Sequence, residues 1–204
     1  KLLSIALTSR DKSSINPVPL CGVPHHAAQG YIAKLLKAGR TVALCEQVED
    51  PKLSKSLVRR EVVRLYTPGT LVDTEFLSPG ESYFLAAVAF SDVMAPSLKR
   101  GPIAGLACLD VSTGEFWVTE FEGDGAGIQL MDELARLEPR EVLHPDSDTN
   151  AISCLTRLSG ARLCAKPSAF FNPKEAARLL QAQFAVHSLE GFGCRGLTVG
   201  IGSA

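Results

Sequence analysis

The amino-acid sequence predicts an α/β protein built from two modules, and three observations carry this prediction. Segments in which apolar residues recur at helical spacing alternate with short β-rich segments along most of the 204 residues. A turn-rich stretch, VDTEFLSPGES, interrupts this alternation at residues 72–82. The balance of charge also differs, because residues 1–76 hold 11 Lys/Arg and 7 Asp/Glu, whereas residues 77–204 hold 10 and 15. We therefore predict a first domain over 1–76, a linker over 77–82 and a second domain over 83–204.

The first module is expected to contain one helix among strands. Strands are predicted over residues 2–8, 41–48 and 58–66, and a helix over 27–38. Gly39 is a natural stop for this helix, because glycine tolerates the left-handed backbone that ends many helices. The TPGT sequence after the last strand is a strong turn signal.

The second module opens with strands and continues as helix–strand alternation. Strands are predicted over residues 83–90, 103–111, 115–121, 141–144 and 161–165, and helices over 128–137 and 152–158. The last helix opens at Asn172, which caps it, with Pro173 at its first position and Glu175 at its third. The C-terminal GLTVGIGSA stops without a closing element, so the second domain is expected to end short of its last helix.

Composition excludes several classes of protein. No run of 18 apolar residues is present, so no membrane span is predicted, and the first ten residues are too polar for a signal peptide. The six cysteines form no CxxC pair and mostly lie in apolar runs, which is typical of reduced thiols in a cytoplasmic protein.

The motifs with catalytic or metal-binding potential are weak. His25 and His26 lack the further converging ligands that zinc requires, so no metal site is predicted. The glycines of GDGAG at 123–127 lack the spacing of a dinucleotide fingerprint, and we interpret this segment as a flexible loop. The sequence also has no phosphate-binding G-x-x-x-x-G-K-[S/T] motif and no nucleophile elbow. No catalytic residue is predicted, and the residues alone indicate a binding or scaffolding protein.

Asp110 leaves two interpretations open. It ends a strand before a tight hairpin, a place where ribonuclease-H-like folds hold a metal-binding carboxylate, and Glu115 lies nearby. The alternative function is therefore a metal-dependent nuclease that uses Asp110 and Glu115, although two-metal chemistry needs further carboxylates. The preferred interpretation is a turn residue whose carboxylate accepts backbone N–H hydrogen bonds.

Cations in the first module are candidates for phosphate contacts. Arg60 and Arg64 alternate on one predicted strand and are expected to share a face with Val62. Phosphate contacts of this kind position nucleic acid without reading its sequence.

A long series of ordered motifs resembles the bacterial MutS family. It comprises PVPLCGVPHHAAQGYIAKLL, CEQVEDP and VRREVVRLYTPGT in the first module, followed by LDVSTGEF, ELARLEPRE and LEGFG in the second. The resemblance implies that the first domain is the latter part of a mismatch-binding domain. It also implies that the second is a connector domain of ribonuclease-H-like fold, which couples DNA binding to distant ATPase sites and is not a nuclease.

The resemblance also implies site residues. Arg10 and Arg60 match positions that contact DNA in the family, and Leu20 and Cys21 match the loop that approaches the minor groove. The helix near 175–183, with Arg178 and Leu179, matches a surface involved with the MutL partner. The family's mismatch reader, a Phe-x-Glu motif, lies before the first residue of this chain in the family's order, and no Phe-x-Glu occurs in this sequence.

The expected partners follow from the same resemblance. They are mismatched double-stranded DNA, MutL and a second copy of the parent protein. ATP and Mg²⁺ are expected to serve the parent protein, and this part of it is expected to have neither cofactor nor enzymatic activity. A protein-interaction module alone is the remaining alternative.

Overall fold

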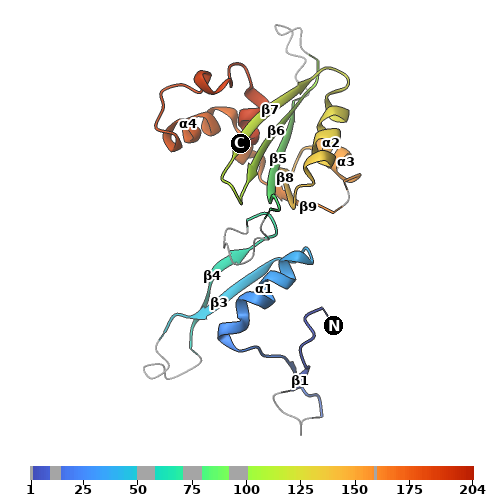
Figure 1. The fold of residues 1–204 in the computed structure, drawn as a ribbon, viewed down its shortest axis with the longest axis vertical. Coiled ribbons are helices and arrows are strands. Elements are labelled where there is room, and N and C mark those ends of the chain that lie inside the picture. The colour runs from blue at the N-terminus through green and yellow to red at the C-terminus, as the bar shows by residue number, and fades with distance from the viewer. Residues whose placement is uncertain (1, 10–14, 50–57, 71–79, 92–100, 159) are drawn as a thin grey trace. The chain divides into compact units, whose positions relative to one another are not determined.

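The structure, a computed structural model, describes residues 2–9, 15–49, 58–70, 80–91, 101–158 and 160–204, without the side chains of 149–151 (Figure 1). The chain divides into two compact units, Lys1–Leu71 and Val72–Ala204. Both units mix helices with sheets, as the sequence predicts.

The described part of the N-terminal unit holds two small antiparallel sheets and one α-helix. The elements are β1 (Thr8–Ser9), β2 (Pro19–Leu20), the 3-10 helix η1 (His25–Ala27), α1 (Ala28–Lys37), β3 (Val42–Gln47) and β4 (Arg60–Tyr66). β1 pairs with β2, and β3 pairs with β4. The strand predicted over residues 2–8 is wrong except at Thr8. Residues 2–3 form a turn and Ser4 has a φ of 52°, which no extended strand allows.

Helix α1 forms where its apolar periodicity predicts it. Ile32 and Leu36, one turn apart, are buried, while the opposite face is exposed. Gly39 ends the helix with a φ of 70°, and its N–H bonds the carbonyl of Leu36 at 2.9 Å.

The C-terminal unit is built on one five-stranded sheet (Figure 1). Its strands are β5 (Phe84–Ser91), β6 (Ile103–Asp110), β7 (Phe116–Glu122), β8 (Glu141–Pro145) and β9 (Arg162–Lys166). They lie in the order β7-β6-β5-β8-β9, with β5, β6 and β7 antiparallel and β5, β8 and β9 parallel. Numbered along the unit, this is a 3-2-1-4-5 order in which β6 alone runs antiparallel to the other strands, which is the ribonuclease-H-like arrangement expected from the resemblance.

The helices that pack against this sheet are α2 (Ala126–Leu137), α3 (Thr149–Leu155) and α5 (Thr198–Ser203), and α4 (Pro173–Gln183) packs on α5. The 3-10 helices are η3 (Ser168–Phe171) and η4 (Glu190–Phe192). Leu130 and Leu134 of α2 are fully buried in one core with Leu106 and Val142 of the sheet. Asn172 caps α4 as predicted, since its side chain accepts hydrogen bonds from the N–H groups of Lys174 and Glu175.

Helix α5 corrects the expectation that the C-terminal residues form no closing element. Gly105 on β6 lets α5 approach the sheet, because a Cβ there would meet the Val199 carbonyl at 2.6 Å. Gly200 does the same from the helix side, and its N–H donates to Glu120 Oε1 at 2.8 Å. The six-residue helix is therefore held by close packing rather than by an apolar stripe that a sequence pattern reveals. Among the described residues, no helix is both long and apolar enough to cross a membrane.

Candidate nucleic-acid interface

Arg60 and Arg64 lie on opposite faces of the β3–β4 sheet, contrary to the prediction. Leu44 pairs with Arg64, whereas the next residue, Cys45, pairs with Val62. Val63 is therefore an extra residue, a β-bulge that reverses the alternation of side chains along β4. Because paired residues share a face, Arg60 stays with Val62 but Arg64 moves to the other side. The sequence pattern had no sign of this bulge.

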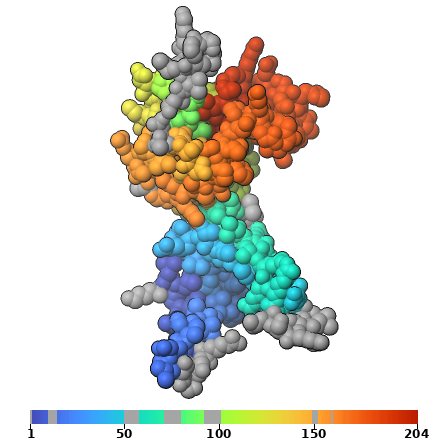
Figure 2. Space-filling view, turned by 180° about the vertical axis from the view of Figure 1, so that it is seen from behind, coloured from blue at the N-terminus to red at the C-terminus, as the bar shows by residue number. Residues whose placement is uncertain are grey.

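The face that carries Arg60 is open in the described part of the chain. Arg60, Cys45 and Val62 are all exposed, and Val62 retains 59% of its surface. The neighbouring Arg59 forms an ion pair with Glu61, so its charge is partly neutralised. Among the described residues, Arg60 has no side-chain partner, and its guanidinium is available to a phosphate. Figure 2 shows atoms of β4, in teal, at the surface of this unit.

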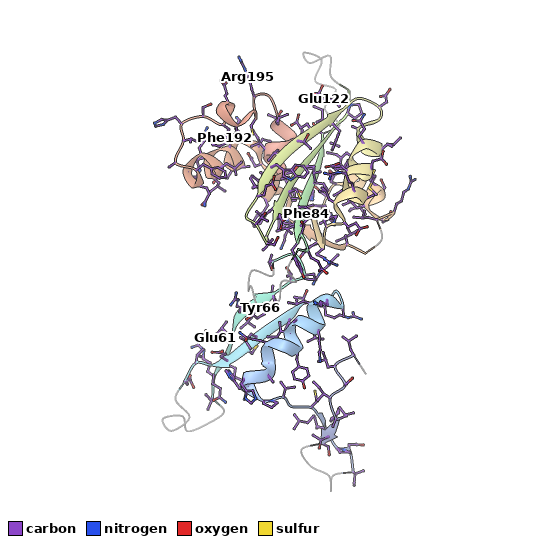
Figure 3. The ribbon with its side chains drawn as sticks, viewed as in Figure 1. Glu61, Tyr66, Phe84, Glu122, Phe192 and Arg195 are labelled. Carbon is purple, nitrogen blue, oxygen red and sulfur yellow. The ribbon has the colours of Figure 1, made fainter. Side chains whose placement is uncertain are left out.

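Arg64 faces the side of the sheet that α1 covers. Its guanidinium carbon lies 4.8 Å from the ring centre of Tyr66, which is itself buried. This cation–π contact holds the exposed Arg64 side chain over an aromatic face. Figure 3 labels Tyr66 and, at the other end of β4, Glu61. The spacing Arg-x-Tyr is the one signal in the sequence that could have revealed this contact, since alternate strand residues share a face.

The segment around Leu20 is extended and exposed. Leu20 pairs with Thr8 in the short β1–β2 ladder and keeps 47% of its surface exposed. Cys21 follows it with a free, exposed thiol. These two side chains are accessible, as a loop that approaches a groove requires, but they are on different elements from Arg60 and Arg64. Arg10 lies outside the described residues.

Asp110 is a structural turn residue in this fold. Its Oδ1 accepts hydrogen bonds from the Ser112 hydroxyl at 2.6 Å, the Ser112 N–H at 2.9 Å and the Tyr83 N–H at 3.2 Å. Burial alone would raise the pKa of Asp110, but the hydrogen bonds from Ser112 and Tyr83 outweigh it and hold the pKa below its usual value. Glu115 is exposed, and the described residues contain no group of three His, Cys, Asp or Glu that could hold a metal ion. The nuclease alternative is not supported.

Helix α4 presents a partly apolar surface. Arg178 forms an ion pair with Glu175 at 2.6 Å, and Leu179 keeps 53% of its surface exposed. Leu179 lines a hollow of about 640 Å³ together with Phe170, which is 74% exposed, and Leu180. Phe170 was missed by sequence reasoning, because nothing in the SAFF segment distinguishes an exposed Phe from a buried one.

Comparison with known proteins agrees with this architecture. The family model described as MutS domain I matches residues 1–75, and the one described as MutS domain II matches residues 83–204. Relatives described as DNA mismatch repair protein MutS align over the whole chain. That of Syntrophobacter fumaroxidans is 47% identical over 204 residues, and those of Desulfosudis oleivorans and Myxococcus xanthus are each 42% identical, over 206 and 210 residues. The chain spans 22% of the length of each of these relatives.

A small α/β unit with exposed cations, joined in sequence to a unit with the strand order of ribonuclease-H-like folds, defines the class as a two-domain α/β protein. Both domain models match in their family order, and together they account for nearly the whole chain. The chain belongs to the MutS family.

Proposed function

We propose that this chain is the part of a mismatch-repair protein that supports DNA at a mismatch and connects that binding to the rest of the protein. The observation that carries the proposal is the match of both MutS domains, in order, across residues 1–75 and 83–204. The accessible guanidinium of Arg60 supports a role in holding the DNA backbone. We propose that residues 1–76 form the domain that supports DNA and that residues 83–204 form the domain that connects this binding to the rest of the protein. Residues 77–82 are the proposed linker between them.

The proposed DNA-contacting residues are Arg10, Leu20, Cys21, Arg60 and Arg64. Apolar side chains such as Leu20 fill a widened minor groove without requiring a particular base edge. Arginines bind phosphates and so set the register of the duplex. The reading of the mismatch itself is assigned to other residues of the parent protein.

The experiment that tests this function is a binding titration with the full-length parent protein. Matched and mismatched duplexes of one length are compared by gel shift, and tighter binding of the mismatched duplex is expected. Equal affinity for both duplexes would overturn the proposal.

Arg60→Ala tests the phosphate role within the same titration. We expect weaker binding to every duplex sequence and a salt dependence that is shallower by about one unit of slope. Arg157→Ala is the matched control, because Arg157 is an exposed arginine of the other unit. A loss that depends on the sequence of the duplex would contradict a backbone contact.

A second proposed role, as a docking surface for MutL, rests on α4. The exposed Leu179 and Phe170 border one hollow, and apolar side chains of this kind anchor protein interfaces. Arg178→Ala with Leu179→Ala is expected to reduce capture of MutL while DNA affinity stays unchanged. Unchanged MutL capture by this variant would contradict the proposed role of α4 as a docking surface.

The remaining proposals concern the full-length parent protein. We propose that it is a cytoplasmic homodimer and an ATPase that uses ATP and Mg²⁺. The supporting observation is that its relatives share this chain at 42–47% identity and bear the name of a DNA mismatch repair protein.

A further inference from the structure

The exposed side of α1 carries cations that the site above does not use. We define the α1 cationic face as Lys34, Lys37 and Arg40. Lys34 and Lys37 lie three residues apart on the helix, opposite the buried Ile32 and Leu36. Arg40 follows directly after the glycine that ends the helix, and all three side chains are exposed.

The charge of this face is not neutralised within the described part of the chain. Lys34, Lys37 and Arg40 form no ion pair with any described residue. The sequence holds no Asp or Glu at all from residue 12 to residue 45, although the whole chain has a net charge of −1. Cations gathered in an acid-free stretch of 34 residues create a local positive potential that attracts a polyanion.

Tyr31 orients part of this face. The Nζ of Lys34 lies 5.4 Å from the centre of the Tyr31 ring, one turn earlier on the helix. The contact keeps the lysine stem against the helix while its ammonium group stays exposed. A cation held in this way loses less conformational entropy when it binds a phosphate.

The position of α1 separates this face from Arg60. One side of the β3–β4 sheet is covered, because Val42 and Leu44 of β3 are half-buried there and Tyr66 of β4 is buried. The opposite side is exposed, so α1 packs on the side that carries Tyr66. Arg60 is on the exposed side because of the β-bulge at Val63. Lys34 and Lys37 are exposed while Ile32 and Leu36 of the same helix are buried, so the α1 cationic face and Arg60 belong to different sides of the β3–β4 sheet.

We propose that the α1 cationic face is a second phosphate-binding surface for double-stranded DNA, which holds a stretch of backbone distinct from the one at Arg60. Duplex DNA fits because it presents one negative charge per roughly 1.7 Å of axis, a dense line that pairs with several neighbouring cations at once. No base edge is read, so the contact is independent of sequence. The inference rests on the proposed function, because it assumes that the parent protein binds duplex DNA.

The test uses the full-length parent protein and fluorescence anisotropy over salt concentrations of about 50 to 200 mM. The variant is Lys34→Gln with Lys37→Gln and Arg40→Gln, which keeps helix-compatible side chains and removes three charges. The control is Arg157→Gln with Lys174→Gln and Arg195→Gln, which removes three exposed charges from the other unit. Circular dichroism checks that both variants keep their helix content.

We expect the α1 variant to bind a matched duplex of about 40 base pairs with a salt slope shallower by about 2 to 3 units, since each lost phosphate contact removes about 0.9. The control is expected to keep the slope of the wild type. On a mismatched duplex of about 15 base pairs, which offers fewer phosphates to a second surface once its mismatch is held, the α1 variant is expected to lose less than about one unit.

The failures of the two proposals are distinguishable. An unchanged slope on the long duplex, together with a wild-type preference for mismatched DNA, overturns the second surface and leaves the proposed function intact. A wild type without that preference overturns the proposed function, whatever the slope of the variant. A variant that binds both duplexes like the wild type but no longer binds polyglutamate overturns the DNA assignment in favour of an acidic protein partner.

Discussion

The two units differ in how completely they bury their apolar side chains. In the C-terminal unit, α2 and α5 cover the sheet, and residues such as Leu106, Leu130 and Val142 are fully buried. In the described part of the N-terminal unit, the buried apolar residues are Ile32, Leu36 and Tyr66. One side of its β3–β4 sheet leaves Val62 and Leu65 each 59% exposed.

This difference separates a scaffold from a binding surface. A unit whose side chains interlock resists local opening, whereas exposed side chains on a lightly packed sheet are free to meet a partner. The candidate DNA contacts all lie in the lightly packed unit. Four substitutions test this contrast, in order of decreasing expected effect.

Leu130→Ala is expected to have the largest effect on stability. Leu130 is fully buried in the core between α2 and the sheet, so its truncation should lower the free energy of unfolding by about 2–5 kcal/mol. Val62→Ala in the other unit should change it by less than about 0.5 kcal/mol. Urea unfolding monitored by circular dichroism measures both. Equal losses for the two variants would remove the contrast between the units.

Gly105→Ala is expected to loosen α5 from the sheet. The added Cβ would lie 2.6 Å from the Val199 carbonyl, which is backbone and cannot rotate away, so the cost should be about 1–3 kcal/mol. Gly191→Ala is the control, because a Cβ there meets nothing within 4 Å. Amide hydrogen exchange of residues 198–203 should accelerate in Gly105→Ala alone. Unchanged exchange would mean that α5 does not depend on this close approach.

Asp110→Asn is expected to change how stability depends on pH. The folded-state pKa of Asp110 lies below its usual value, so its contribution is present at pH values above the unfolded pKa and is lost as the pH falls through the folded pKa. The amide cannot ionise, so the variant should lose about 1 kcal/mol at neutral pH and show a weaker acid-side decline. Unfolding free energies from pH 7 down to about pH 3 provide the measurement. Parallel pH profiles for the two proteins would contradict a lowered pKa.

Gly30→Ala is expected to stabilise the lightly packed unit slightly. Gly30 lies inside α1, and a Cβ there meets nothing within 4 Å, so alanine should add about 0.5–1 kcal/mol through its helix propensity. Gly39→Ala should do the opposite, because Gly39 has a φ of 70°. Hydrogen exchange of the α1 amides distinguishes the two. Slower exchange in both variants would contradict the role of Gly39 as the end of the helix.

Elements with strong local signals were predictable from the sequence. The apolar period ending at Gly39 predicted α1, and the Asn172-Pro173 start predicted α4, because both signals act within one helical turn. The five strands of the large sheet were also found, although their order depends on pairings distant in sequence. The ribonuclease-H-like topology came from the family resemblance, and the observed strand order agrees with it.

The errors concern interactions that no local pattern encodes. Helix α5 contains Gly200 and Gly202, which disfavour an isolated helix, and it forms because glycines allow it to approach β6 and β7. Residues 2–7 have β-rich composition but form no strand in the described structure. For the candidate site, the types of residue were predictable, but the faces of Arg60 and Arg64 were not, since one unpaired residue decides them.

The β-bulge at Val63 changes which side of the sheet the later residues of the seven-residue strand β4 face. Because Arg60 precedes the extra residue and Arg64 follows it, their side chains lie on opposite sides of the sheet, and substitutions at Arg60 and Arg64 act on separate surfaces. Deletion of Val63 would remove the extra residue and still leave Arg64 opposite Leu44 and Tyr66 opposite Val42, so both side chains would keep their faces. The bulge therefore accommodates one additional residue in β4 while Tyr66 keeps its buried place on the α1 side of the sheet.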